Sequence, residues 1–213
     1  AVPDKDLSAK PRSSISVQCC IVGGGPAGMM LGYLLGRAGI KTVVLEKHAD
    51  FFRDFRGDTV HPSTMQVLHE LGLVDDFFKL PHQRIQKLDL VFGGTTIRMA
   101  DLSLLKIAYP FIAFIPQWDF LNLLRDNGRR YPSLQVMMDT EATGLITSGG
   151  QVTGVLAETA NGPVEIHADL TVGCDGRSSI IREQAGLAVQ DIGAPMDVLW
   201  FRVAKDSNDN ESV

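Results

Sequence analysis

A glycine-rich turn near the N-terminus is the part of the sequence best suited to hold a ligand. Residues 19–28 read CCIVGGGPAG, so an apolar strand leads into three consecutive glycines and Pro26 falls in the first turn of a helix. Main-chain N–H groups approach a diphosphate closely only where side chains are absent, and a helix N-terminus adds unpaired donors and partial positive charge. Gly23, Gly25 and Gly28 take the three positions at which such a turn needs a small residue. The sequence therefore predicts a phosphate-binding turn.

An acidic residue follows at the spacing of a dinucleotide site. The expected helix continues through Met29–Arg37, Gly39 is placed to end it, and Lys41–Leu45 reads as the second strand. Glu46 follows that strand, eighteen residues after Gly28. This is near the ~20-residue spacing at which a carboxylate accepts hydrogen bonds from an adenosine ribose. The order of parts predicts a βαβ dinucleotide site without a 2′-phosphate, and it leaves open whether the dinucleotide is FAD or NAD.

Composition narrows the class of protein. The chain has 213 residues, 45% of them hydrophobic and 21% charged, which predicts a soluble globular protein of one large domain or one and a half. A net charge of −5 without a clustered Lys or Arg run gives no footprint for nucleic acid or an anionic membrane. Residues 1–14 are polar and no apolar run approaches the ~20 residues of a membrane span. We therefore expect a cytoplasmic enzyme whose partner is a small molecule.

Cysteine and histidine usage points away from disulfides and metals. Cys19 and Cys20 are adjacent in the first strand, where neighbouring side chains point to opposite faces, so we expect reduced packing residues. The five histidines show no metal-ligand spacing and no Cys-x-x-Cys accompanies them, which predicts that there is no metal site. His61 begins a helix, and the surface interpretation of this residue is preferred over contact with a ligand.

The remainder of the chain alternates short elements. Helices are expected over His61–Gly72 and from about Gln117 to Arg130, with a hairpin around Gly93-Gly94. The expected strands are Leu88–Phe92, Thr95–Leu102, Ala113–Ile115, Leu134–Asp139, Glu141–Thr147, Gln151–Glu158, Pro163–Ile166, Ala168–Cys174 and Val198–Val203. Asp175-Gly176 then opens a helix through Arg182. This is a second strand-to-helix turn, which open α/β sheets use to build a ligand crevice at strand C-termini.

Together these residues resemble the flavoprotein monooxygenases of the para-hydroxybenzoate hydroxylase type, the single-component aromatic hydroxylases that use FAD and NAD(P)H. The resemblance covers about Val17–Val203. It rests on three separated signals: the glycine turn with Glu46, Arg56-Gly57 with the helix from Pro62, and the CDGRSS motif at 174–179 with Arg182. These later signals select FAD over NAD as the tightly held nucleotide.

The resemblance implies an α/β fold: a Rossmann-like FAD-binding domain with an inserted β-rich substrate domain, truncated at the C-terminus. The family carries a further Gly-Asp motif downstream that does not occur before Val213, so we expect the N-terminal half of such an enzyme. The expected segments are a flexible lead-in at 1–16, the FAD-binding βαβ and following helix at 17–80, a substrate-domain hairpin at 81–112, a return to the FAD-binding domain at 113–186, and an incomplete second substrate-domain segment at 187–213.

The resemblance also names candidate cofactor-binding residues. They are Gly23, Gly25, Pro26, Ala27, Gly28, Glu46, Lys47, Arg56, Gln117, Asp175 and Gly176. Three have ordinary alternatives: Arg56 as a solvated loop cation with Arg53 as its rival, Gln117 as a helix-start residue satisfying local donors, and Asp175 as an acid that caps the following helix. No catalytic residue is identified, which fits a mechanism in which the cofactor carries the chemistry.

The implied activity is hydroxylation of an aromatic or similar small organic substrate, driven by NAD(P)H reduction of FAD. Two alternatives remain open. One is another FAD-dependent oxidoreductase of the same fold, a halogenase or a prenyl reductase. A halogenase would show a Trp-x-Trp-x-x-Ile-Pro run, whereas Trp118 and Trp200 stand alone. The other is a non-catalytic nucleotide-binding fragment. Substrate, nicotinamide type and oligomeric state are not predicted.

Overall fold

The structure is a computed structural model, and it describes residues 13–52 and 58–193. The chain divides into two compact units, residues 1–51 with 124–192 and residues 52–123 with 193–213. Residues 58–80, which were expected in one segment with the βαβ motif, belong to the same unit as the hairpin region. Helix α4 (Gln117–Gly128) contributes residues to both units.

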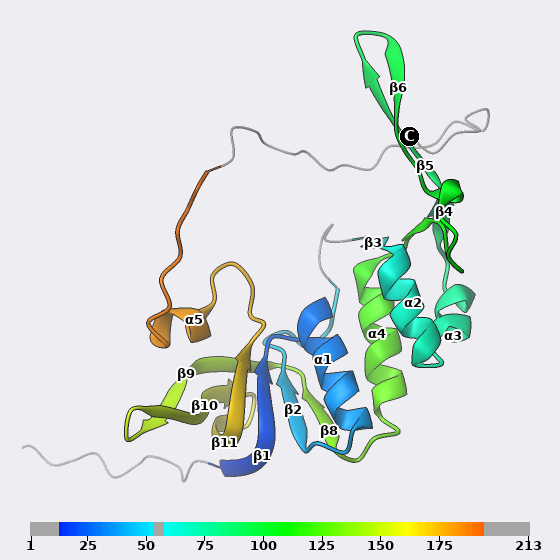
Figure 1. The fold of residues 1–213 in the computed structure, drawn as a ribbon. Coiled ribbons are helices and arrows are strands. Elements are labelled where there is room, and N and C mark those ends of the chain that lie inside the picture. Colours follow the sequence, from blue (N-terminus) through cyan, green and yellow to red (C-terminus); the bar gives the residue numbers. More distant parts are fainter. Residues whose placement is uncertain (1–12, 53–57, 194–213) are drawn as a thin grey trace, which may run out of the picture. The chain divides into compact units, whose positions relative to one another are not determined.

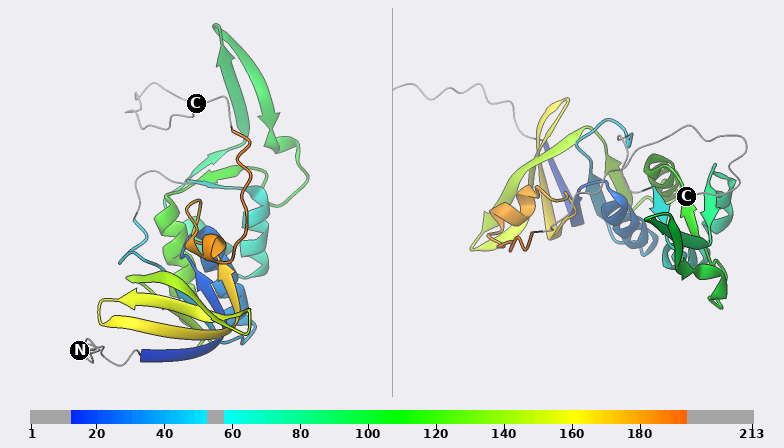
Figure 2. Two further views of the ribbon diagram at one scale, coloured as in Figure 1. Left: turned by 90° about the vertical axis from the view of Figure 1, so that its left-hand side faces the viewer. Right: turned by 90° about the horizontal axis from the view of Figure 1, so that it is seen from above.

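A six-stranded mixed sheet forms the first unit (Figure 1). Its order is β8-β2-β1-β11-β10-β9, in which β8, β2, β1 and β11 are parallel and β10 and β9 continue as an antiparallel meander. The strands span Ser13–Val22 (β1), Thr42–Leu45 (β2), Leu134–Met137 (β8), Thr140–Ser148 (β9), Gln151–Thr159 (β10) and Gly162–Gly173 (β11). In the left view of Figure 2 the meander appears in yellow-green to yellow beside the blue β1. The expected Rossmann-like α/β fold is confirmed.

Two strand predictions at this sheet were wrong. Pro163–Ile166 and Ala168–Cys174 were expected as separate strands, but β11 is one strand that pairs with β1 from Ser13↔Val164 to Val22↔Gly173. His167, which lies between the two expected strands, occupies one position of a continuous ladder, opposite Ser16. For the same reason β1 begins at Ser13, inside the stretch 1–16 that was expected to be a flexible lead-in.

Helix α1 (Pro26–Arg37) lies close to the parallel strands because small residues line its sheet-facing side. A Cβ added to Gly32 would lie 2.5 Å from Cγ2 of Val44, and one added to Gly36 would lie 2.7 Å from Cβ of Leu134. The helix ends as predicted at Gly39, whose φ of +78° suits glycine. The N–H of Gly39 donates to the Gly36 carbonyl and the N–H of Ile40 to the Leu35 carbonyl, which satisfies the last turn.

Cys19 and Cys20 are buried free thiols, as predicted. Burial, and to a smaller extent the neighbouring Cys19, raises the pKa of the Cys20 thiol from its ordinary value of 9.0 to about 12. Between pH 9.0 and about 12 the thiol is therefore mostly neutral in the folded protein and mostly ionised in the unfolded chain. Stability from this group is complete below pH 9.0 and is lost as the pH rises toward 12.

A pH series should show this loss. Between pH 8 and pH 11 we expect the free energy of unfolding of the wild type, measured with urea under reducing conditions, to fall by on the order of a few kcal/mol more than that of Cys20→Ala. The alanine variant lacks the Cys20 thiol but keeps every other group that ionises at alkaline pH, so the difference between the two proteins isolates Cys20. If the difference in the free energy of unfolding between the two proteins does not change with pH, the raised pKa of Cys20 is contradicted.

The second unit combines short helices and strands. The predicted helix appears as α2 (Pro62–Glu70), and Gly72 follows it. The expected strand at Ala113–Ile115 is β7 (Ile112–Phe114), the centre of a three-stranded sheet in the order β3-β7-β4. The sequence analysis missed β3 (Thr59–Val60), β4 (Gln83–Ile85) and α3 (Val74–Lys79).

The predicted hairpin is β5 (Lys87–Phe92) with β6 (Thr95–Asp101), joined at Gly93-Gly94, which both have positive φ. A 3₁₀ turn over Leu102–Leu104 follows, so β6 ends before the predicted Leu102.

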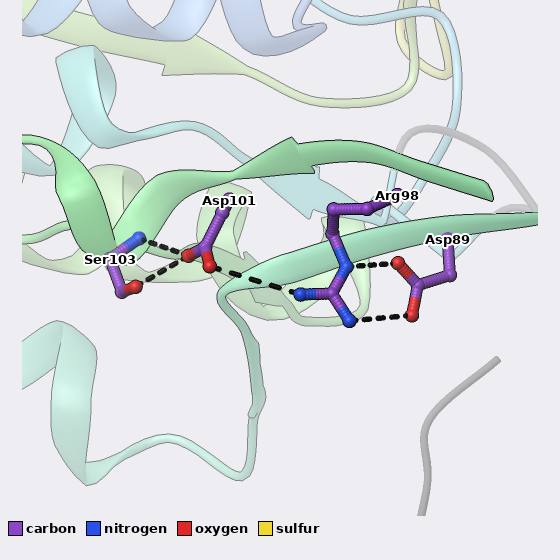
Figure 3. Close-up of polar contacts among 4 residues, drawn as sticks. All are labelled: Asp89, Arg98, Asp101 and Ser103. Carbon is purple, nitrogen blue, oxygen red and sulfur yellow. Dashed lines mark hydrogen bonds and ion pairs between the residues drawn. The ribbon is translucent and has the colours of Figure 1, made fainter.

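One face of the hairpin carries a charged network, shown in Figure 3. The Arg98 guanidinium makes a two-point contact with Asp89, with Nη2 3.1 Å from Oδ2, and its Nη1 lies 3.8 Å from Oδ2 of Asp101. Oδ1 of Asp101 accepts the Ser103 N–H at 3.0 Å. The paired guanidinium lowers the pKa of Asp89, and the Ser103 donors lower that of Asp101. These exposed contacts hold the two strands and the following turn together.

Among the residues that the structure describes, no helix is both long and apolar enough to cross a bilayer. Within the same ranges, no group of three or more His, Cys, Asp or Glu residues is placed to hold a metal ion.

Candidate cofactor site

The carboxyl ends of the parallel strands bring the predicted site residues of the first unit to one edge of the sheet. Gly23 follows β1, Glu46 follows β2 and Cys174 follows β11, and these strands are parallel and in register at their ends. The Gly23 N–H donates to the Leu45 carbonyl at 2.8 Å, and the Cys174 N–H donates to the Val22 carbonyl at 2.6 Å. The two strand-to-helix turns therefore lie side by side, as the sequence predicted.

Two glycines of the turn are required by the fold itself. Gly23 has φ +109°, and a Cβ there would lie 2.3 Å from the Cys174 carbonyl oxygen. A Cβ on Gly28 would lie 1.9 Å from the Gly23 carbonyl oxygen. Real Cβ atoms do not approach backbone this closely. These glycines let the β11 turn and the first turn of α1 close on the end of β1.

Gly25 is different, because no residue that the structure describes requires a glycine there. Its φ of −71° and ψ of −178° are accessible to any residue, and a Cβ built there meets no atom of residues 13–52 and 58–193 within 4 Å. It is the N-cap of α1, so the N–H groups of Gly25, Ala27 and Gly28 have no acceptor within the helix, and Pro26 has no N–H to leave unpaired. The first turn of α1 holds no acidic residue. Open space at the positive end of a helix fits a diphosphate.

Glu46 is held against this turn by main-chain donors. Its Oε2 accepts the Gly24 N–H at 3.1 Å and its Oε1 accepts the His48 N–H at 3.0 Å, and only 9% of the residue is exposed. A Cβ on Gly24 would lie 2.8 Å from Cβ of Glu46. The carboxylate is thus prepositioned beside the glycine turn, where the spacing argument placed it.

The sequence did not predict that Gly24 and His48 orient Glu46 through their main-chain N–H groups. Gly24 is buried, and its N–H and its lack of a side chain both serve Glu46. One signal could have indicated this role of Gly24. The turn pattern needs glycine at positions 23, 25 and 28 but not at 24, so a third glycine there called for a separate explanation. His48 contributes only its main-chain N–H, which no residue type reveals.

Asp175 performs the helix-capping role that was one of its two interpretations. Its Oδ1 accepts the Ser179 hydroxyl at 2.5 Å and its Oδ2 accepts the Ile181 N–H at 3.3 Å. Ser179 is the N-cap of α5 (Ile180–Gln184), and its Oγ accepts the Arg182 N–H at 3.0 Å. The predicted contact of Asp175 and Gly176 with a cofactor stays a prediction.

The structure gives less information on the remaining candidate residues. Lys47 is exposed and directly follows Glu46. Gln117 is the first residue of α4 and belongs to the second compact unit, so its approach to the glycine turn stays a prediction. Arg56 and its rival Arg53 lie outside the described residues.

Cys174, the residue before Asp175, offers no activated thiolate. Its burial, followed by the charge of Asp175, raises the pKa of its thiol. No nucleophile of this kind is therefore available at the turn, which is consistent with a site that binds a cofactor and leaves the chemistry to it.

Comparison with known proteins decides the family. The pattern of a family described as "FAD binding domain" matches residues 16–213, nearly the whole chain. The chain belongs to this family. Its cofactor is therefore FAD, and the open space at Gly25 beside the start of α1 and the prepositioned Glu46 fit that dinucleotide.

Individual members of the FAD-binding family are similar over most of the chain. A 6-methylpretetramide 4-monooxygenase from Streptomyces rimosus is 29% identical over 194 residues, which are 91% of this chain and 46% of the relative. Among solved structures, p-nitrophenol 4-monooxygenase from Pseudomonas putida DLL-E4 superposes with a TM-score of 0.73 at 24% identity, over 83% of this chain and 45% of that one. An anhydrotetracycline hydroxylase from Streptomyces rimosus gives a TM-score of 0.70 at 27% identity, over 81% and 34%. The chain spans less than half the length of these proteins.

Proposed function

We propose that this chain is the FAD-binding part of an NAD(P)H-dependent monooxygenase that hydroxylates an aromatic small molecule. The observation that carries the proposal is Gly25, a helix N-cap with room for a side chain that the fold does not forbid and a diphosphate would. Similar proteins whose names describe monooxygenases and hydroxylases support the reaction class.

Each residue of the turn has a defined part in this proposal. The N–H groups of Gly25, Ala27 and Gly28 donate to the diphosphate of FAD, and Pro26 sets the start of the helix without an unpaired N–H. Glu46 accepts hydrogen bonds from the adenosine ribose, since its carboxylate is already oriented by Gly24 and His48.

The other candidates have supporting roles in this proposal. Gly23 brings the β11 turn against the glycine loop, and Asp175 with Gly176 reaches the cofactor from that turn. Lys47, Arg56 and Gln117 supply a cation or an amide on the approach to the phosphates or the flavin. When bound, FAD supplies the redox chemistry, accepting reducing equivalents from NAD(P)H. The chain positions it.

The reaction class is tested by turnover. The whole enzyme of which this chain is the proposed FAD-binding part is loaded with FAD and mixed with NADH or NADPH and a panel of phenols. Nicotinamide oxidation is followed by absorbance and product mass by mass spectrometry. The proposal predicts faster oxidation with a suitable phenol and a product heavier by one oxygen atom. A chlorinated product would indicate a halogenase. Oxidation that no aromatic compound accelerates would contradict the monooxygenase assignment and leave the FAD site standing.

Glu46→Ala should weaken FAD binding by about 1 to 3 kcal/mol, because the ribose hydroxyls lose a charged acceptor and the Gly24 N–H loses its partner. Titration followed by flavin fluorescence measures the affinity. Glu46→Gln is the matched control, since it keeps the shape of the side chain and one acceptor oxygen. Its FAD affinity should lie between those of the wild type and Glu46→Ala. Equal affinities of wild type and Glu46→Ala would remove this residue from the site.

A further inference from the structure

Asp139 has an unusual backbone conformation just after the end of β8. Its φ is +51°, and among the residues that the structure describes it is the one non-glycine residue with a positive φ. Most side chains disfavour this left-handed conformation, whereas aspartate and asparagine tolerate it better than others. Such residues persist where the surrounding structure fixes them, and they cluster at functional sites. The conformation of Asp139 therefore calls for a reason.

The ladder between β2 and β8 shows where this residue departs from regular pairing. The Thr42 N–H donates to the Ser133 carbonyl at 2.7 Å, and the Glu46 N–H donates to the Met137 carbonyl at 2.9 Å. The bonds of a parallel ladder are evenly spaced, so the next one would run from the Asp139 N–H to the Glu46 carbonyl.

The structure has one extra residue at this point, and it changes which carbonyls are held. The Thr140 N–H donates to the Glu46 carbonyl at 2.9 Å, in the place that a regular ladder gives to position 139. The Asp139 N–H turns instead to the His48 carbonyl, also at 2.9 Å. The carbonyls on both sides of Lys47 are thus bonded to this turn.

These two bonds fix the segment that orients the Glu46 carboxylate. Its Oε1 accepts the N–H of His48, two residues further on, which requires a tight bend at Lys47. The turn at Asp139 holds both ends of that bend. It is itself anchored, since Thr140 is buried and begins β9. The side chain of Asp139 is exposed, so the connection to the Glu46 carboxylate runs through the main chain.

We propose that Asp139 is a positioning residue for the adenosine end of FAD. Its left-handed backbone, and not its carboxylate, holds residues 46–48 so that the Glu46 carboxylate faces the ribose. The inference rests on the contact between Glu46 and the ribose in the proposed function. It adds a requirement at position 139, where the residue has to tolerate a positive φ.

Substitutions at position 139 separate the backbone from the side chain. Asp139→Gly and Asp139→Asn both lack the carboxylate and tolerate a positive φ, so their FAD affinity should stay within about twofold of the wild type. Asp139→Val carries a branched side chain that disfavours this conformation. It should weaken FAD binding by about tenfold in a titration followed by flavin fluorescence.

Glu141→Val is the matched control for the valine substitution. Glu141 is exposed, lies two residues further along the chain in β9, and has no positive φ. The same new side chain is therefore placed on the same strand without a conflict with the backbone, and FAD should bind this variant as it binds the wild type.

Coupling to Glu46 distinguishes positioning from a general loosening of the fold. Because Asp139 acts through Glu46, Asp139→Val should weaken FAD binding no more than Glu46→Ala does. Added to Glu46→Ala, it should cause no further loss of affinity, although the melting temperature should fall in both backgrounds. Losses of affinity that add independently would show that Asp139 only supports the fold, and they would overturn the proposal.

Hydrogen exchange without FAD gives a second test. The His48 amide, whose acceptor is the Glu46 carboxylate, should exchange about tenfold faster in Asp139→Val than in the wild type and at the wild-type rate in Asp139→Gly. An unchanged His48 amide in the valine variant would contradict the positioning role. If Asp139→Val does not fold, Asp139→Ala replaces it in both measurements, with smaller effects in the same direction.

The variants also separate this inference from the proposed function. Weaker FAD binding in Glu46→Ala, together with full affinity in Asp139→Val, would leave the ribose contact standing and reject the role of Asp139. Equal losses in Asp139→Gly, Asp139→Asn and Asp139→Val would assign the role to the carboxylate and overturn the proposal. Full affinity in Glu46→Ala would reject the ribose contact itself, and the positioning role with it.

Discussion

Gly25→Val should abolish FAD binding while leaving the protein folded. A Cβ built at Gly25 meets no atom of the described residues within 4 Å and its backbone φ of −71° is ordinary, so we expect the fold to tolerate valine there. The branched side chain would occupy the space in front of the first turn of α1, where the diphosphate has to approach the main-chain N–H groups. We expect an affinity loss of at least about 100-fold, close to 3 kcal/mol, in a titration followed by flavin fluorescence.

The control for this variant is a substitution at an exposed position farther along the same helix. Leu34 is 39% exposed on α1, and Leu34→Ala should change neither the fold nor the FAD affinity. Gly25→Ala should show a smaller loss than Gly25→Val, because its side chain is shorter. Full FAD affinity in Gly25→Val, with an unchanged melting temperature, would show that the phosphates do not pass this residue.

Gly28→Val should give the opposite result and destabilise the fold directly. A Cβ at Gly28 would lie 1.9 Å from the Gly23 carbonyl oxygen, a main-chain atom held in place because β1 is paired on both sides. The helix must therefore move away from the sheet. We expect the free energy of unfolding, measured by urea denaturation without cofactor, to fall by about 3 kcal/mol or more.

The comparison that isolates this effect is Gly28→Ala, since the clash comes from the Cβ itself. Alanine should cost nearly as much stability as valine, which distinguishes a backbone clash from crowding by the larger side chain. A Gly28→Ala protein as stable as the wild type would mean that α1 does not lie as close to the glycine loop as the structure shows.

The sequence predicted the local parts of this fold well where a residue type has one physical purpose. Gly39 ends α1 in a conformation that favours glycine, and the Gly93-Gly94 pair makes the hairpin turn. Glu46 lies beside the turn because the end of β2 is paired with the end of β1. Each of these outcomes depends on short-range geometry that residue spacing reports.

The parts that escaped prediction depend on partners distant in the chain. The pairing of β1 with β11 joins residues about 150 positions apart, and it makes one strand of a stretch that was expected to form two. Helix α3 has six residues, too few for a periodic pattern, and is held by the buried Val74 and Phe77. No spacing shows that the Gly24 N–H donates to Glu46.

The most direct test of the account follows individual amide protons while FAD is added to ¹⁵N-labelled protein. The resonances of Gly25, Ala27 and Gly28 should shift in proportion to occupancy, because these N–H groups receive the diphosphate, and Gly93 at the hairpin tip should not respond. FAD that binds and leaves the three turn amides unchanged would contradict the central claim.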